Sequence, residues 1–496
     1  MDAIHIEIPT IFFEERSISD EDWAKTPESV RRGFEWLWKE QERLRAQTEQ
    51  SSRNSSLPSS TDRPQHQRPA RTVSTGRRPG GQPGHVGVTR PLVPEILLSA
   101  PPVHVRPTVC PCGHPIPPDA ELTGAPYRLQ HWELPLIAPQ VTETRLDHCT
   151  CEHCGRVVRA ALPVGMPALT LGPHVQALVT LLTGQYHLSK QSVSTLMRSV
   201  FGMPISVASV IAVEQAASAA LEAPVAAVIV QAQAAPIKHL DESGWRQQRE
   251  LDPGTPDGTP LKKSWIWSMT TADATIYLIR RSRAASVAHE LLGFDYTVPL
   301  TLQMVVITDR HGAYNWLPLW ARQICWALLD RDFVAISERS NPVARRIGLA
   351  LLAQADLLWA AWHAHRQGHM TFAELGTALT PVRAQVAQLL REGHDADKRT
   401  QTTCHNLRTL EPALWTFLRV EGVEPTNNIG ERSQRRGVVK RERTGGTQTS
   451  AGSRFVERIL STAATCRQQG KNPLTYLTEA IIAYQYGRDA PALIGP

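Results

Sequence analysis

Apolar residues near the start of the chain recur with the spacing of one face of a helix. They follow Thr26 and Pro27, a residue suited to capping a helix and a proline suited to its first turn. The seam consists of Val30, Phe34, Leu37 and Leu44. This pattern predicts a helix within residues 1–50. Two heptads are too few to define a stable coiled coil, so self-association through the seam and packing on the protein's own body both remain open.

Three further segments with helical periodicity follow one another between residues 173 and 221. Ser189 and Ser206 stand where serine commonly caps a helix N-terminus. The pattern predicts a helical module over residues 166–235. A DNA-binding module of the helix-turn-helix type and a plain three-helix spacer both fit it.

After Pro236 the apolar positions change to the short alternating runs of β-strands. Strands are predicted at IKHLDESGW, SWIWSMTT, ATIYLIRR, MVVITD and QICWALL, with one helix through Ser282–Leu292. This combination predicts a mixed sheet with an inserted helix over residues 236–333. Helical periodicity then returns over residues 341–400 and near residues 408–418, 426–440 and 450–468.

Composition places the chain among ordinary folded proteins. It has 496 residues, of which 42% are hydrophobic and 20% charged, with a formal net charge of +6. A length of this size corresponds to roughly three domains. No run of about 18 or more uncharged apolar residues is present, and the first residues are acidic where a signal peptide is basic. We therefore expect a soluble cytoplasmic protein, associated with the nucleoid and not with a membrane.

Residues 51–92 are rich in Ser, Pro, Gly and Arg and cannot build a hydrophobic core. Residues 63–90 contain six arginines, Arg77 and Arg78 among them, and no acidic residue. A flexible arm that neutralises DNA phosphates and a basic but inert linker are both consistent with this composition.

Five of the eight cysteines gather between residues 110 and 154. Cys151 and Cys154 have the two-residue spacing that lets two thiolates face one ion, whereas Cys110 and Cys112 are one residue closer. These four are the first choice of ligands for a structural Zn²⁺ in a ribbon-like domain over residues 93–165. Alternative ligands are Cys149, His114 and His148.

Two aspartates follow predicted strands of the same sheet. Asp241 follows the strand Pro236–Leu240 and Asp309 follows Met304–Thr308. Like charges at one sheet edge repel unless a divalent cation lies between them, and hard oxygen ligands suit Mg²⁺. Glu431, on a later predicted helix, is the candidate third acid for a site with two such ions.

Other acidic residues compete with these three. Glu242 would point to the opposite face of the strand from Asp241, and Asp330 and Asp332 are more simply explained as the acidic first turn of a helix. Glu431 is followed by six basic residues suited to phosphates, namely Arg432, Arg435, Arg436, Lys440, Arg441 and Arg443.

Taken together, these motifs resemble the transposases of the insertion sequence 66 family. The matching segments span nearly the whole chain in the family's order. They are RRPGGQPGH, the cysteine knuckles, HLDESGW, SWIW, ITDRHGAYNW, ICWALLDRDF, TNNIGERSQR, KRERTGG and FVERILSTAATCRQQGKNPLTYL.

The resemblance implies a multidomain α+β protein with a ribonuclease H-like mixed sheet as catalytic core. It implies that Asp241, Asp309 and Glu431 bind two Mg²⁺ or Mn²⁺ ions. It also implies that residues 334–405 form an all-helical insertion and that residues 406–496 complete the core. A coiled-coil segment and a zinc-binding domain are implied ahead of the core.

The sequence departs from the family pattern at three points. Leu328 stands where the family usually has histidine, Gly430 stands where alanine is more common, and the Cys110–Cys112 spacing is short. We expect a DNA transposase that cuts element ends and joins them to double-stranded target DNA, as a homo-oligomer and with or without accessory proteins. The alternative is a catalytically inactive zinc-containing DNA-binding protein derived from one.

Overall fold

The computed structural model of the chain describes residues 25–49, 90–135, 137–163, 166, 170–247, 263–294 and 304–495. Its central element is a five-stranded sheet in the order β5-β4-β3-β6-β7. The strands are β3 (Ile237–Trp245), β4 (Ser264–Thr270), β5 (Thr275–Arg280), β6 (Val305–Thr308) and β7 (Arg322–Ile324). β3, β4 and β5 pair antiparallel, whereas β3, β6 and β7 pair parallel. The predicted mixed sheet is confirmed, but the strand predicted at QICWALL is wrong beyond its start. β7 ends at Ile324 and the helix α8 (Trp326–Ser337) follows, because Cys325 already has the extended backbone of a helix N-cap.

The strand predicted at IKHLDESGW is confirmed as β3, but the shorter strand Pro236–Leu240 used to place Asp241 is not. Parallel pairing of β3 with β6 ends at His239, but antiparallel pairing with β4 continues to Trp245. The expectation that the strand ends before Asp241 was therefore wrong, because β4 supplies backbone partners on the other side. Asp241 nevertheless lies just past the last parallel pair.

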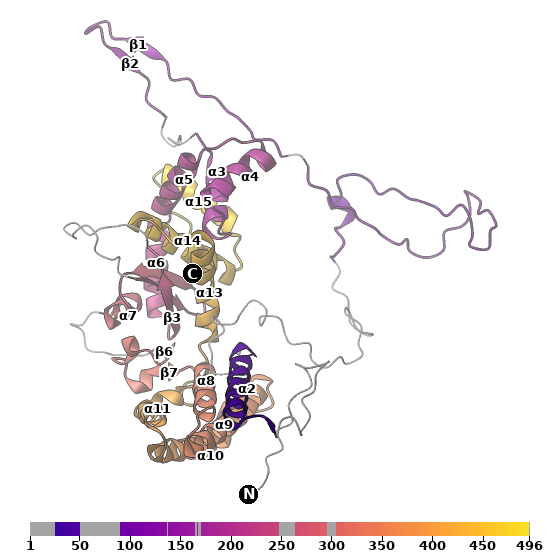
Figure 1. The fold of residues 1–496 in the computed structure, drawn as a ribbon. Helices are drawn as coiled ribbons and strands as arrows, with labels where there is room; N and C mark the ends of the chain where they lie inside the picture. Colours follow the sequence, from indigo (N-terminus) through magenta and orange to yellow (C-terminus); the bar gives the residue numbers. More distant parts are fainter. Residues whose placement is uncertain are drawn as a thin grey trace.

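Two helical layers cover the sheet. On one face, α14 (Ser450–Gln468) packs against β5, and α13 (Asn428–Thr444) lies against β3 and β4. On the other side, the helices that follow β7 pack against β6 and β7 through Val305, Ile307 and Ile324, and they lie at that end of the sheet (Figure 1). Alternate residues of β6 divide between the two cores, since Val306 belongs to the first and Val305 and Ile307 to the second.

The predicted helical insertion is present. It comprises α8 (Trp326–Ser337), α9 (Pro342–Arg366), α10 (Phe372–Glu392), η6 (Gly393–Asp395) and α11 (Lys398–Thr409). Asn341 caps α9, and Thr371 with Glu374 forms a capping box on α10. The backbone N–H of Trp326 donates to the carbonyl of Pro425 (2.9 Å), so the chain leaves the sheet and returns at one point.

A single helix predicted near residues 408–418 is wrong. The structure instead has the short α12 (Glu411–Leu414) and the turn η7 (Thr416–Leu418), because Pro412 starts a new helix rather than continuing α11.

Helices α3 (Pro173–Gly184), α4 (Lys190–Phe201) and α5 (Val207–Ala220) form the predicted helical module. The hydroxyls of Ser189 and Ser206 accept hydrogen bonds from the backbones of Ser192 and Ser209, so both predicted caps are confirmed. The module has a small hydrophobic core of its own. It also packs against helices of the main body. Those helices are α6 (Glu222–Ala234), α14 and α15 (Pro473–Gln485).

Smaller elements complete the described chain. α7 (Ala285–Leu292) follows β5, and η4 (Gly312–Tyr314) and η5 (Leu319–Ala321) lie between β6 and β7. α2 (Glu28–Glu49) is the predicted N-terminal helix, and Val30 and Leu37 of its seam are 44% and 57% exposed. The described residues between 90 and 163 form η3 (Glu95–Leu97) and the hairpin of β1 (His148–Thr150) and β2 (Val157–Arg159), and otherwise no helix or strand. This part projects away from the helices (Figure 1).

Among the described helices, α9 has the length and apolar composition needed to cross a membrane. α5 and α6 reach that length and composition only when they are taken together, and they are bent relative to each other. In α9, the side chains of Ile347, Leu351 and Leu358 are fully buried in the second core. Leu349 and Leu357 of the same helix are 55% and 54% exposed, so packing inside the protein accounts for one apolar face of α9 and not for all of its apolar residues.

Candidate active site

The sheet brings the two predicted aspartates to one edge. Asp241 lies two residues beyond His239, the last residue of β3 paired with β6, and Asp309 directly follows β6. Because β3 and β6 are parallel neighbours, the chain segments that leave their carboxyl ends meet at this edge. The sequence argument for this pair is supported by the register.

Glu431 lies in the first turn of α13, where the positive end of the helix dipole favours a carboxylate. Burial raises the pKa of Asp241 well above its ordinary value. The charges of Glu242, Asp309 and Glu431 raise this pKa further. Asp241, Asp309 and Glu431, here called the acidic cluster, are therefore electrostatic neighbours despite their separation in the chain.

The loop that carries Asp309 is fixed by hydrogen bonds on both sides. Its carboxylate Oδ1 accepts from the backbone N–H of His311 (2.8 Å), and its carbonyl accepts from the guanidinium of Arg322 (2.8 Å). Arg322 is fully buried and also donates to the hydroxyl of Thr308 (3.0 Å). Burial lowers the pKa of Arg322 to about 10. The sequence analysis missed Arg322, whose only signal is a charged residue at the start of a buried strand.

Asn427 connects the helix that carries Glu431 to the strand that carries Asp241. Its side-chain Nδ2 donates to the carbonyl of Leu240 (2.6 Å), and its Oδ1 lies 3.1 Å from Nδ1 of His239. Because Nδ2 is the amide donor, the His239 imidazole is the donor to Oδ1. Asn427 is 1% exposed. It was not chosen from the sequence, although it lies within the quoted motif TNNIGERSQR.

Cys325 provides a second support for Glu431. Its Sγ accepts from the backbone N–H of Asn427 (3.1 Å), and its thiol lies 3.9 Å from Oε1 of Glu431. Burial raises the pKa of this thiol to about 12, so it stays protonated and can donate. Leu328 follows in the first turn of α8 and is half-buried.

Gly430 is explained by its contact with Asn427. A β-carbon added at residue 430 would lie 2.7 Å from Oδ1 and 3.0 Å from Nδ2 of the Asn427 side chain. Glycine therefore leaves room for the amide that contacts β3. The departure from alanine at this position has a local steric reason.

Glu242 is close enough to the acidic cluster to raise the pKa of Asp241, but its carboxylate is paired with other residues. Its side chain is 1% exposed and accepts from Arg283 (2.8 Å) and from the hydroxyl of Tyr314. Burial raises the pKa of Glu242, and the charge of Asp309 adds to the shift. Burial also raises the pKa of Tyr314 well above its ordinary value. Glu242 is thus paired within the protein, and its role as the rival of Asp241 is not favoured.

The sequence model of the transposase IS66 family matches residues 169–454, more than half of the chain. The chain belongs to the IS66 transposase family. No curated protein sequence matches it. The matched region contains the whole acidic cluster, and the mixed five-stranded sheet fits the core of a transposase with an acidic triad. IS66 transposases act in DNA transposition, which requires DNA binding.

The basic residues of α13 in this IS66 transposase do not share one environment. Arg432 and Arg435 are exposed, and Arg436 is half-buried with a guanidinium nitrogen that lacks a partner within the described residues. Lys440 is 6% exposed, and its Nζ donates to the carbonyl of Thr183 (2.7 Å). The expectation that Lys440 contacts phosphate does not fit this placement, because the helix turns it toward α3. Arg77 and Arg78 lie outside the described residues.

Each cysteine knuckle is folded, but the two are separate. In both, a glycine N–H donates to the first cysteine carbonyl (2.8 Å): Gly113 to Cys110 and Gly155 to Cys151. A backbone hydrogen bond from His114 is the main cause that lowers the pKa of Cys112 to about 7. The segment around residue 110 and the β1–β2 hairpin extend in different directions (Figure 1). The described residues contain no group of three or more His, Cys, Asp or Glu arranged to hold a metal ion.

Asp330 and Asp332 are placed differently from the sequence expectation. α8 begins at Trp326, so both lie inside the helix rather than in its first turn. Asp332 accepts from Arg310 (2.5 Å), and Asp330 accepts from the indole of Trp359 (2.9 Å). Neither is among the charges that raise the pKa of Asp241.

Proposed function

We propose that this IS66 transposase cleaves the ends of a mobile DNA element and joins them to target DNA through a site built on a ribonuclease H-like core. Asp241, Asp309 and Glu431 would hold two divalent cations, Mg²⁺ or Mn²⁺. The observation that carries the proposal is that the parallel register of β3 and β6 brings Asp241 and Asp309 to one edge of the sheet, where Glu431 at the start of α13 is close enough to act on the pKa of Asp241.

The donor types of the acidic cluster suit such ions, although the three carboxylates do not surround one point in the described structure. Carboxylate oxygens are the hard ligands that Mg²⁺ prefers, and a cation would relieve the repulsion that raises the pKa of Asp241. Two bound ions supply activation of the attacking hydroxyl and stabilisation of the leaving oxygen in phosphoryl transfer.

The protein's own part in this proposal is to position the carboxylates. Arg322 fixes the loop of Asp309, while Asn427 and Cys325 fix the start of α13 and with it Glu431. Arg432 and Arg435 are exposed on the same helix and are suited to contact phosphates beside the cluster.

The test is strand transfer of a labelled element end into target DNA with Mg²⁺, comparing wild type with Asp241→Asn, Asp309→Asn and Glu431→Gln. We expect each variant to lose strand-transfer activity by more than about 100-fold. A loss of that size is the upper range for removal of a residue that only positions a metal ligand. The exposed Asp273, in the turn between β4 and β5, supplies the matched control Asp273→Asn. Equal activity of Asp241→Asn and wild type would refute the proposal.

The inactive alternative makes a different prediction in the same assay. A DNA-binding protein without a working site would retard the labelled element end without nicking it. A nuclease of the same core would cut the end and fail to join it to target DNA. Observation of joined product that requires Mg²⁺ excludes both.

A further inference from the structure

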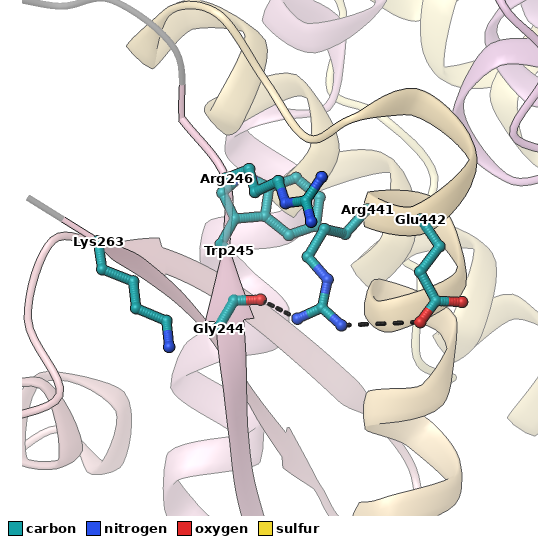
Figure 2. Close-up of a pocket in the computed structure, with 6 residues that line it drawn as sticks. All are labelled: Gly244, Trp245, Arg246, Lys263, Arg441 and Glu442. Atoms are coloured by element: carbon teal, nitrogen blue, oxygen red, sulfur yellow. Dashed lines mark hydrogen bonds and ion pairs between the residues drawn. The ribbon is translucent and has the colours of Figure 1, made fainter. Parts of the chain in front are cut away.

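A basic pocket lies at the far end of β3 from the parallel strands. It has a volume of about 480 Å³. Its lining residues, shown in Figure 2, are Gly244, Trp245, Arg246, Lys263, Arg441 and Glu442. Arg441 was named above among the basic residues that follow Glu431, but the pocket itself has no role in the proposed function.

The walls of the pocket are held together by the turn that ends α13. Gly446 has φ +92°, and a β-carbon there would lie 1.9 Å from the carbonyl oxygen of Arg246, so only glycine allows this approach. The backbone N–H of Thr447 donates to the same carbonyl (2.9 Å), and its hydroxyl accepts from the indole of Trp245 (2.9 Å). The end of β3 and the end of α13 therefore form one fixed structure.

Three cations converge on the pocket with one acid nearby. Lys263 and Arg441 lie on either side of Gly244 (Figure 2), and a β-carbon at Gly244 would lie 3.5 Å from the Lys263 Nζ and 3.7 Å from an Arg441 nitrogen. Arg246 is exposed, and its guanidinium has no recorded partner among the residues that the structure describes. The single acid, Glu442, is 65% exposed and lies 3.8 Å from Arg441.

The surroundings of the three cations suit an anion. Arg441 is anchored on β3 through the Ser243 hydroxyl (3.2 Å) and the Gly244 carbonyl, which fixes its guanidinium in the pocket. Lys263 lies over the ring of Trp265 (4.7 Å) and keeps its ammonium exposed. Like charges held this closely raise the local positive potential, and a bound anion would lower their mutual repulsion.

The pocket and the acidic cluster share two elements. Gly244 is three residues beyond Asp241 on β3, about 10 Å along a strand. Arg441 is ten residues beyond Glu431 on α13, about 15 Å along a helix. Successive phosphates of one DNA strand advance about 3.4 Å along the helix axis, so the pocket lies a few nucleotides from a phosphodiester placed at the acids.

We propose that the basic pocket binds a backbone phosphate of the DNA strand a few nucleotides from the bond that is cut. The inference rests on the proposed function only for the position of that bond. The ligand is a phosphodiester, recognised by charge and not by base sequence. Arg246 and Lys263 contact it, and the anchored Arg441 completes the positive field.

The test measures binding of a short fluorescent DNA duplex of arbitrary sequence to the full chain while KCl is varied. Arg246→Ala/Lys263→Ala removes both exposed cations of the pocket. Arg345→Ala/Lys398→Ala is the matched control, since it removes the same two charges from exposed positions on the helical insertion. We expect the pocket variant to bind about fivefold more weakly, with a slope of log K against log salt shallower by about one to two.

Equal slopes for the pocket variant and the control variant would overturn the proposal. A second arm adds inorganic phosphate at constant ionic strength. If phosphate raises the melting temperature of wild type and not of the pocket variant, while the two have the same slope of log K against log salt for DNA, the pocket binds free phosphate. That result would also overturn the proposal. Failure of wild type to cleave element ends would refute the proposed function and leave the slope comparison intact.

Discussion

The side-chain amide of Asn427 donates a 2.6 Å hydrogen bond to the carbonyl of Leu240, the residue that precedes Asp241. Asn427 also lies four residues before Glu431 at the start of α13. One side chain therefore sets the position of the helix relative to the strand, and with it the position of the third acid relative to the first.

Loss of this amide should reduce activity without abolishing DNA binding. We expect Asn427→Ala to lower strand transfer by about 10–100-fold, the usual effect of removing an outer-shell partner, while the affinity for element DNA stays near that of wild type. Asn428 is exposed on the next position and gives the matched control Asn428→Ala. Wild-type activity of Asn427→Ala would show that the amide does not position Glu431.

Gly430 and Asn427 should show a strong interaction in a double-mutant cycle. Alanine in a helix interior is favoured over glycine by about 1 kcal/mol, but its β-carbon would lie 2.7 Å from the Asn427 amide oxygen. We expect Gly430→Ala alone to gain no free energy of unfolding and to lose activity, as Asn427→Ala does. In the Asn427→Ala background the same change should stabilise the protein by about 1 kcal/mol. Additive effects, measured by urea unfolding, would contradict the steric explanation.

Asp330 should make stability depend on pH. Burial raises its pKa from 3.8 to about 6, so the folded state holds this proton more tightly than the unfolded state. Its contribution to stability is full below about pH 4 and is lost as pH rises through 6. We expect Asp330→Asn to raise the free energy of unfolding at pH 8 by about 1–3 kcal/mol, and by less at pH 5. The measurement is the gain in free energy of unfolding at pH 5 and at pH 8 for Asp330→Asn and for the exposed control Asp273→Asn. A gain for Asp330→Asn that is the same at both pH values would contradict this prediction.

The cysteine knuckles predict a measurable metal content. If Cys110, Cys112, Cys151 and Cys154 bind one structural Zn²⁺, the purified chain should contain about one zinc ion and Cys151→Ser should lose it. Cys149→Ser is the matched control within β1 and should retain the metal. Zinc retained by Cys151→Ser would remove this residue from the ligand set, and zinc lost from both variants would favour Cys149 as a ligand.

Local patterns predicted the elements that carry the acidic cluster, because strand alternation and helical periodicity are encoded by neighbouring residues. Asp309 was placed correctly after its strand, and Glu431 on its helix. The alternating pattern of IKHLDESGW also gave the extent of β3, whereas the end of its parallel pairing at His239 depends on contacts with β6 that no local pattern encodes.

The hydrogen bonds that position the acidic cluster also could not be predicted from sequence patterns. Asn427 and Leu240 are far apart in the chain, and their hydrogen bond exists only in the folded protein. Lys440 belongs to a run of basic residues that suggests an exposed surface. Its burial against Thr183 follows from the packing of α13 against a distant helix.

The hydrogen bond between Trp326 and Pro425 has a consequence for comparing such proteins. The helices between these two residues leave the sheet at Trp326 and return to it at Pro425, and residues just before Pro425 also contact β7, since the Thr416 hydroxyl donates to the carbonyl of Arg322. The number of residues in this excursion therefore does not set how far Glu431 lies from Asp309. Chains with larger or smaller excursions between the same two backbone positions would keep the same geometry of acids.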